Sequence, residues 1–258
     1  MSAIEESDAG DVRDQVSAAE WSQRVELAAC YRMIAHLGWD DLVFTHISAR
    51  VPGAEAHFLL NPYGMMFEEV TASSLVKVDL DGNKVLPSPH DIIPAGFVIH
   101  SAVHAARADA HCVMHLHTPE GVAVSAQKDG LLPVSQTALY VLPSLGRHPY
   151  EGVAINDEEK PRLQADLGRN RFLLLDNHGL LTTGRTVGEA FLSMFTFQRA
   201  CEVQLLAQSG GAALVAVSPD IIKGIAAQAK QTLGDGGANR AWPAIMRKMD
   251  RLDPSYRH

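Results

Sequence analysis

The sequence holds few of the features that define several protein classes. Cys30, Cys112 and Cys201 are its only cysteines, and their odd number and wide spacing exclude a disulfide framework and a cysteine-rich zinc site. No apolar run approaches the roughly 20 residues of a membrane span, and residues 1–15 lack the apolar centre of a signal peptide. We expect buried thiols, a cytoplasmic location and no membrane partner.

Positive charge is scarce as well. The 258 residues include 22 lysines and arginines and 30 acidic residues, which gives a net charge of −8. The basic residues do not gather into a stripe along the sequence. This balance argues against a nucleic-acid partner. The chain also lacks a glycine-rich dinucleotide turn and a phosphate-binding Gly-Lys-Ser/Thr loop. Its hydrophobic content of 47% is ordinary for a globular protein with a sizeable core.

The chain is expected to begin with a disordered acidic tail over residues 1–16. Order is predicted from Ser17 onward, because Ser17 and Glu20 form the pattern of a capping box at the start of an amphipathic helix. Gly38 is the predicted end of that helix, since glycine commonly terminates helices.

Strand and helix patterns then alternate without a repeat or a linker. Strands are predicted at 43–51, 57–60, 75–79, 84–86, 112–117, 171–175 and 180–183, and helices at 96–106, 118–127, 157–167, 187–208, 219–230 and 239–251. We therefore expect one α/β domain over residues 17–215 and a helical C-terminal extension over residues 216–258 that packs on the same domain.

Two histidines one residue apart close a hydrophobic run. In a strand, residues i and i+2 point to the same face, so His115 and His117 would lie side by side, with Met114 and Leu116 on the other face. Such a pair makes half of a divalent-metal site, and a distant loop can supply a third ligand, as His178 in an Asp-Asn-His-Gly segment could. The alternative is that His115 and His117 are surface or hydrogen-bonded strand histidines.

Several motifs occur together in a fixed order. They are Phe44-Thr45-His46-Ile47-Ser48-Ala49-Arg50, Leu60-Asn61-Pro62-Tyr63-Gly64, Val78-Asp79-Leu80-Asp81-Gly82, His115-Leu116-His117 and Asn177-His178-Gly179-Leu180. Over residues 20–215 this series resembles the class II aldolase/adducin family. The resemblance implies a three-layer α/β/α fold with a mainly antiparallel central sheet, a homotetramer with active sites near subunit interfaces, and catalytic zinc. By the same resemblance, His115, His117 and His178 match the metal-binding histidines.

One position departs from the aldolases of that family. They place a glutamate, which binds metal and moves protons, at the start of the helix before the His-x-His strand, and here that position is Gly96. The small hydroxyl residues that hold substrate phosphate in those aldolases are likewise replaced here, around Pro94 and Ala95. The segment around Gly96 looks like the adducin head and its bacterial relatives. Because no long lysine-rich tail follows, we expect no cytoskeletal role.

The resemblance and the three histidines together predict a metal-dependent lyase. It would cleave a carbon–carbon bond in a small, anionic oxygenated acid or carbonyl compound through an enolate-like intermediate, because a cation held by neutral imidazoles stabilises such charge. Zinc is the first expectation for the metal, with iron or manganese as alternatives. A homo-oligomer is expected, as a tetramer.

A lyase also needs a proton carrier, and two residues are candidates. His46 lies in the segment that resembles the substrate-facing loop of the family, although it could instead be hydrogen-bonded to a turn. Tyr140 lies at a distance from Pro133 comparable to that of the interface tyrosine of the aldolases, although it could be a core residue. The predicted substrate-binding residues are Asn61, Tyr63, Gly64 and Gly96.

Three further residues have ambiguous roles. Glu120 could reach the metal or simply begin a helix, where a carboxylate is favourable, and we prefer the helix. His100 and His104 have i, i+4 spacing that can bind metal, but we interpret them as structural.

Two other functions stay open: a non-haem iron oxygenase or oxidative decarboxylase on the same three histidines, and a non-catalytic, adducin-like assembly module in which the histidines are relics.

Overall fold

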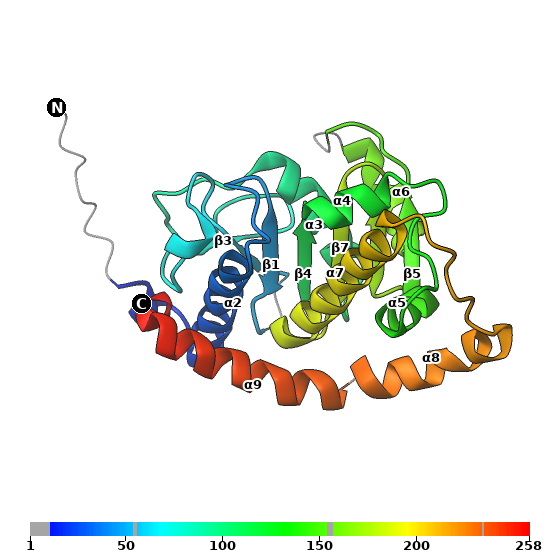
Figure 1. Ribbon diagram of the computed structural model, residues 1–258. Helices are drawn as coiled ribbons and strands as arrows, with labels where there is room; N and C mark the ends of the chain where they lie inside the picture. The colour runs from blue at the N-terminus through cyan, green and yellow to red at the C-terminus, as the bar shows by residue number, and fades with distance from the viewer. Residues whose placement is uncertain (1–10, 54–55, 154–156, 234) are drawn as a thin grey trace.

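The computed structural model centres on a single mixed sheet (Figure 1). It describes residues 11–53, 56–153, 157–233 and 235–258, and among these the sheet has seven strands in the order β3-β2-β1-β4-β7-β6-β5. The strands are β1 (His46–Arg50), β2 (Phe58–Leu60), β3 (Val76–Val78), β4 (Cys112–Leu116), β5 (Leu145–His148), β6 (Phe172–Leu175) and β7 (Gly179–Gly184). Neighbouring strands are antiparallel except β5 and β6, which confirms the expected mainly antiparallel sheet.

Helices cover both faces of this sheet. On one face lie α2 (Ala18–Leu37), α7 (Val187–Ser209) and α9 (Asp235–Leu252), and on the other α3 (Pro94–Ala106) and α6 (Lys160–Leu167). The remaining helices are α1 (Val12–Gln15), α4 (Pro119–Ser125), α5 (Gln136–Val141) and α8 (Pro219–Leu233), with short 3-10 turns η1 (Phe67–Glu69), η2 (Leu142–Ser144), η3 (Asp157–Glu159) and η4 (Pro254–Arg257). The expected three-layer α/β/α architecture is therefore confirmed.

The alternation of residues along each strand creates two separate cores. On β4, Cys112, Met114 and Leu116 join the core beneath α2 and α7, whereas Val113 joins the core beneath α3 and α6. All three cysteines of the chain are buried and unpaired, as expected. His115 shares the α3 face with Val113, so the two-residue period of the strand has placed a polar side chain inside the second layer.

Helix α2 begins and ends where the sequence predicts, but its first turn is stabilised differently. The Ser17 hydroxyl caps the backbone N–H of Glu20 at 3.1 Å, and Gly38 ends the helix with φ +68°. The Glu20 carboxylate does not complete a capping box. It instead binds Arg24 at 3.0 Å and Lys77 at 2.8 Å, in a buried cluster that joins α2 to β3.

Some elements differ from the sequence prediction. Within the predicted disordered tail, residues 1–10 lie outside the described structure, and Val12–Gln15 form helix α1, whose first turn is capped by Asp11. Helix α5 and strand β5 were not predicted at all. Strand β5 contains Gly146, at which a Cβ atom would lie 2.4 Å from the backbone oxygen of Asp166, so packing rather than strand propensity determines its sequence.

The C-terminal helices pack along the lower side of the molecule in Figure 1. Helix α8 contacts α5, and α9 contacts α2 and α7, where the Trp242 ring lies against Gly188. Backbone N–H groups of Ala72 and Ser73 donate to the carbonyl oxygens of Tyr256 and His258. None of the helices in the described ranges is both long enough and apolar enough to cross a bilayer.

The buried ion pair of α2 provides a test of this packing. Replacing Arg24→Met should lower the free energy of unfolding by about 3 kcal/mol, because Glu20 would remain buried after losing one of its two cations. Chemical denaturation would measure the change. The exposed Arg240→Met serves as the matched control and should change stability by less than about 0.5 kcal/mol. Equal effects of the two variants would contradict a structural role for the pair.

Candidate metal centre

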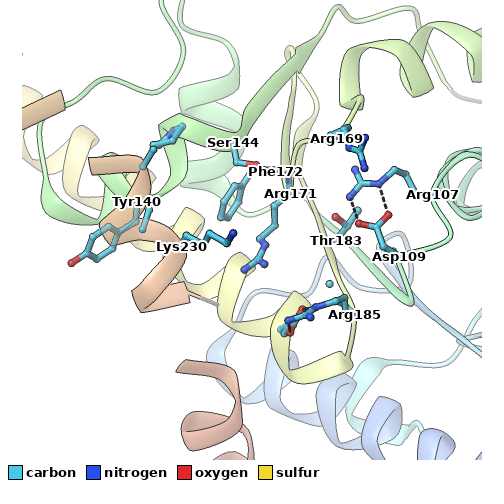
Figure 2. Close-up of a pocket in the computed structure, with 15 residues that line it drawn as sticks. Arg107, Asp109, Tyr140, Ser144, Arg169, Arg171, Phe172, Thr183, Arg185 and Lys230 are labelled. Carbon is cyan, nitrogen blue, oxygen red and sulfur yellow. Dashed lines mark hydrogen bonds and ion pairs between the residues drawn. The ribbon is translucent and has the colours of Figure 1, made fainter. Parts of the chain in front are cut away.

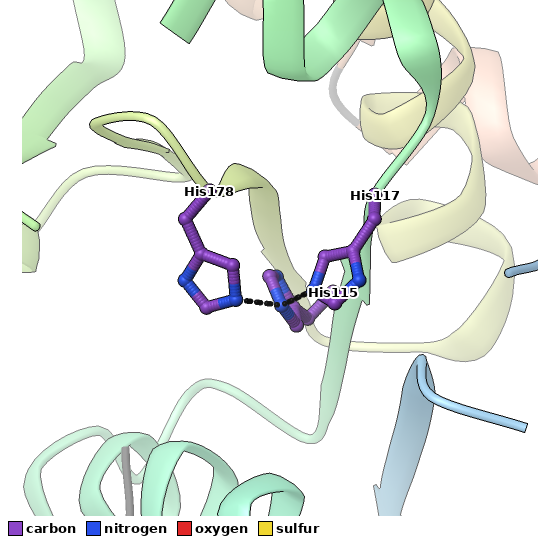
Figure 3. Close-up of side chains that lie close together, drawn as sticks. All are labelled: His115, His117 and His178. Atoms are coloured by element: carbon purple, nitrogen blue, oxygen red, sulfur yellow. Dashed lines mark hydrogen bonds between the residues drawn. The ribbon is translucent and has the colours of Figure 1, made fainter. Parts of the chain in front are cut away.

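Three histidine side chains meet at one end of the sheet (Figure 3). His115 lies on β4, His117 follows the end of that strand, and His178 lies in the turn between β6 and β7. The Nε2 atom of His115 is 2.8 Å from that of His117 and 3.3 Å from that of His178. One ligand atom from each ring lies within 4.8 Å of the other two. The structure therefore brings together the three predicted metal ligands.

The pairing of β4 with β7 explains why a distant loop reaches this point. Leu116 pairs with Leu180, so the turn that precedes β7 sits directly beside the end of β4. The turn requires left-handed backbone at Asn177, with φ +55°, and contains Gly179, with φ +156°. A Cβ atom at Gly179 would lie 2.5 Å from the carbonyl oxygen of Leu116. The Asn-His-Gly sequence thus lets the turn approach β4 closely enough to present His178.

The other ring nitrogens fix where the protons lie. His115 Nδ1 donates to the carbonyl oxygen of Leu180 at 3.0 Å, and His117 Nδ1 donates to Asp41 Oδ2 at 3.1 Å. In neutral rings this leaves both Nε2 atoms as acceptors that face each other without a hydrogen between them. A cation between them satisfies both lone pairs, and ligand nitrogens of a tetrahedral zinc site lie about 3.3 Å apart. These residues fit a divalent cation.

The surroundings also keep the rings in the form that binds metals. Burial, followed by the charges of His117 and His178, holds the pKa of His115 well below its ordinary value. Burial, followed by His117 and His148, lowers the pKa of His178 to about 4. Both rings are therefore neutral at pH 7, as metal ligation requires.

His46 is the cross-strand neighbour of the first ligand. In the antiparallel register of β1 and β4, His46 lies directly opposite His115, and the two ring centroids are 5.1 Å apart. The His46 ring also occupies the space beside Gly96, where a Cβ atom would lie only 2.5 Å from His46 Cδ2. The imidazole of His46 can therefore take this position only because residue 96 is glycine.

A buried chain of hydrogen bonds leads away from His46 into the α3 layer. His46 Nδ1 contacts His100 Nε2 at 2.8 Å, and His100 Nδ1 contacts the hydroxyl of Ser48. Ser48 Oγ lies 2.7 Å from His104 Nε2, and His104 Nδ1 lies 3.0 Å from the carbonyl oxygen of Ala110. The three imidazoles and the hydroxyl are each exposed by 2% or less.

The last member of this chain determines the direction of every bond in it. The Ala110 carbonyl can only accept, so His104 donates from Nδ1 and accepts at Nε2 from the Ser48 hydroxyl. Ser48 must then accept from His100 Nδ1, and His100 Nε2 must accept from His46 Nδ1. Burial lowers the pKa of each ring, so all three are neutral at pH 7. His46 is consequently left with an unprotonated Nε2.

The sequence also matches a known protein family. Residues 25–205 match the family model described as Class II Aldolase and Adducin N-terminal domain. The chain belongs to this family. Its sheet, its three histidines and the turn before His178 are therefore the form that the class II aldolase/adducin fold takes in this protein.

Relatives of the chain in this family carry two kinds of name. A Pseudomonas aeruginosa protein, whose name assigns it provisionally to the class 2 aldolases, is 60% identical over 251 residues, which is 96% of each chain. Mouse alpha-adducin is 42% identical over 243 residues, which is 89% of this chain and 33% of the adducin. The crystal structure of an aldolase II superfamily protein from Pseudomonas syringae has a TM-score of 0.93 and 48% identity, and covers 96% of this chain and 100% of its own.

The other predicted site residues of this family member are less closely grouped. Asn61 is buried at the end of β2, and its Oδ1 atom accepts from the Tyr31 hydroxyl at 3.0 Å. Tyr63 and Gly64 form the turn that follows, where Tyr63 is exposed. Tyr140 accepts from Gln136 at the other end of the sheet (Figure 2), so one chain does not bring it to the histidines. Its catalytic role stays a prediction that requires a second copy.

Sequence reasoning missed Asp41 and Ser48 as parts of the site. Neither has a spacing that marks it, because Asp41 acts through a bond to His117 and Ser48 through bonds to two histidines of another element. The i, i+4 spacing of His100 and His104 was the available signal, and their structural interpretation agrees with their buried contacts. Glu120 lies in the first turn of α4 and accepts from Gln198 at 2.8 Å, which agrees with the helix interpretation.

The buried histidines predict loss of stability in acid. His104 has a pKa lowered to about 3, first by burial, whereas in the unfolded chain it titrates near 6.5. Between these values the unfolded state binds more protons, so stability falls as pH falls. From pH 7 to pH 5, His104 alone should lower the free energy of unfolding by about 2 kcal/mol.

Denaturation at several pH values would measure this slope. The variant His104→Gln should show a shallower fall between pH 7 and pH 5 than the wild type, whatever its stability at pH 7. Replacing the exposed His36→Gln is the control and should leave the slope unchanged. A wild-type slope in His104→Gln would show that its protonation is not coupled to folding.

Proposed function

We propose that this protein is a metal-dependent lyase of the class II aldolase type. The observation that supports it best is the convergence of three histidine Nε2 atoms, two of which, in His115 and His117, belong to rings whose Nδ1 atoms donate elsewhere. His115, His117 and His178 would hold the cation, and Asp41 would orient His117. The bound cation would act as a Lewis acid that stabilises negative charge developing on a carbonyl oxygen.

The residues around the site favour an anionic substrate without phosphate. Three neutral imidazoles supply no negative charge of their own, so a carboxylate or hydroxy-keto group of the substrate would complete the charge balance. Pro94 and Ala95 begin α3 and have no side-chain hydroxyl to hold a phosphate. Asn61, Tyr63, Gly64 and Gly96 would shape the pocket. We propose a small oxygenated acid or carbonyl compound as the substrate.

His46 is the proposed proton carrier in place of the missing carboxylate. The hydrogen-bond chain through His100 leaves its Nε2 atom unprotonated, and the pKa lowered by burial keeps it neutral. A neutral imidazole can accept the hydroxyl proton that leaves when the adjacent carbon–carbon bond breaks, and can return it to carbon. His100 and Ser48 would act as positioning residues, because they fix the ring orientation and the tautomer of His46.

The metal requirement gives the first test of this function. The double variant His115→Ala/His178→Ala should lose bound metal and all turnover, measured by elemental analysis and by NMR of deuterium exchange next to the carbonyl of pyruvate. The exposed His111→Ala is the control and should retain both. Iron in the purified protein together with oxygen-dependent turnover would indicate the oxygenase, and metal-free wild-type protein without exchange would indicate the assembly module.

Asp41 gives a second test, at a residue outside the ligand set. The variant Asp41→Asn should weaken metal binding by about 10- to 100-fold, because His117 loses the carboxylate that orients it. Titration with zinc against a competing chelator would measure the affinity. The neighbouring Asp40→Asn is the matched control. Unchanged affinity in Asp41→Asn would show that this carboxylate does not support the ligand.

The proposed proton carrier can be tested apart from the metal. His46→Gln should keep the metal but lower the exchange rate by about 10²- to 10⁴-fold. Gly96→Ala should have a similar effect, because its Cβ atom would displace the His46 ring. The positioning variant His100→Gln should lower the rate less and shift its pH profile. Wild-type exchange in metal-loaded His46→Gln would exclude it as the carrier.

The assembly and location of the protein remain proposals. We propose a homotetramer in the cytoplasm, following the resemblance to the aldolases. In such an assembly, Tyr140 could reach the three histidines only from a neighbouring copy. Light scattering would give the mass of the assembly. A monomeric protein with full exchange activity would exclude a catalytic Tyr140.

A further inference from the structure

A second polar pocket lies at the opposite end of the sheet from the three histidines (Figure 2). The metal centre sits at the end of β4 and the start of β7. This pocket lies where β4 and β6 begin and β7 ends. Because β7 is antiparallel to both β4 and β6, these three points lie together at the opposite end of the sheet. It has a volume of about 440 Å³ and contains none of the three histidines.

The lining of this pocket is strongly cationic in a protein of net negative charge. Its basic side chains are Arg107, Arg169, Arg171, Arg185 and Lys230, and its acidic side chains are Asp109 and Glu189. Among the residues that the structure describes, five positive and two negative groups give the lining a net charge of +3, against −8 for the whole chain. These residues come from segments far apart in the sequence, so folding concentrates the charge.

Both carboxylates of the lining are already committed to arginines. Asp109 receives two hydrogen bonds from Arg107, at 2.7 and 2.9 Å, and Glu189 receives side-chain bonds from Arg185 at 2.7 and 3.3 Å. These pairs hold two of the guanidinium groups in place. Arg171 is partly buried beside them. Its pKa is lowered, first by burial, while the charge of Glu189 raises it and the charges of Arg185 and Arg107 lower it.

The rest of the lining indicates the kind of anion. Apolar surface comes from Tyr140, Pro143, Phe172 and α8, while the guanidinium groups provide the planar forks that suit phosphate and carboxylate. The volume is larger than a single inorganic ion needs and lies in the range of small-molecule sites. Lys230 on α8 faces the arginines across the pocket, so a bound anion would join α8 to the end of the sheet.

We propose that this pocket binds a small, soluble organic phosphate with at least two negative charges. Its lining contains none of the three histidines, so the site is separate from the metal centre of the same chain. An occupant would contact the cations that precede β6, that of the turn after β7 and that of α8, and would stabilise the folded state by RT ln(1 + [L]/Kd). It would therefore act as an effector or stabilising ligand rather than as the substrate.

Calorimetric titration with pyrophosphate and with ADP tests this site. Both should bind, with adenosine as the uncharged control that does not, and affinity should fall as salt is added. The variant Arg171→Gln/Lys230→Gln should raise the Kd for both anions at least about tenfold. The exposed Arg169→Gln should also weaken binding and keeps the test informative if the double variant does not fold. Arg240→Gln, a surface arginine outside the lining, should bind as the wild type does.

The metal centre must be excluded as the source of the signal. In the background His115→Ala/His178→Ala, pyrophosphate should bind with unchanged affinity if the pocket is the site. Loss of binding in that background, or wild-type binding in both pocket variants, would overturn the proposal. So would a pocket filled by a second copy of the chain, seen as no anion binding in the wild type and a smaller assembly in Arg169→Glu.

Discussion

The antiparallel register between β1 and β4 is the constraint on which the candidate site depends. It places His46 opposite His115 and Ser48 opposite Val113, all on the face covered by α3. A slip of one residue would turn His46 and Ser48 toward the core beneath α2 and leave His100 and His104 without polar partners. The register is held by the apolar residues of the other face, Ile47 and Ala49 among them, which are fully buried. Hydrophobic packing on one face thus positions the polar chemistry on the other.

The sequence predicted the part of the site that follows from local geometry. The two-residue period of a strand was enough to pair His115 with His117, and the Asn-His-Gly turn identified His178. It could not predict Asp41 or the chain from His46 to His104, because those contacts depend on how α3 and the loop before β1 settle on the sheet. Strand β5 and helix α5 were missed for a related reason: their residues are chosen by packing against neighbours and carry little periodic signal.

The two ends of the sheet have opposite electrostatic character. At one end, three imidazoles present ring nitrogens that can bind a cation, and at the other, guanidinium groups present N–H groups that can bind an anion. Strands β4 and β7 run from one end to the other. Each end is built from the residues at which strands stop, where backbone pairing ceases and side chains can converge without breaking the ladder.

The His46 ring fills the space in which a side chain at position 96 would lie, so the two positions constrain each other. A side chain at position 96 would overlap the buried imidazole of His46, since even a Cβ atom would lie 2.5 Å from its ring. Conversely, shortening residue 46 while keeping glycine would leave a hole beside His100. Neither position can therefore be exchanged alone without a loss of packing. Substitutions at the two sites should therefore be non-additive, since each changes the space that is left to the other.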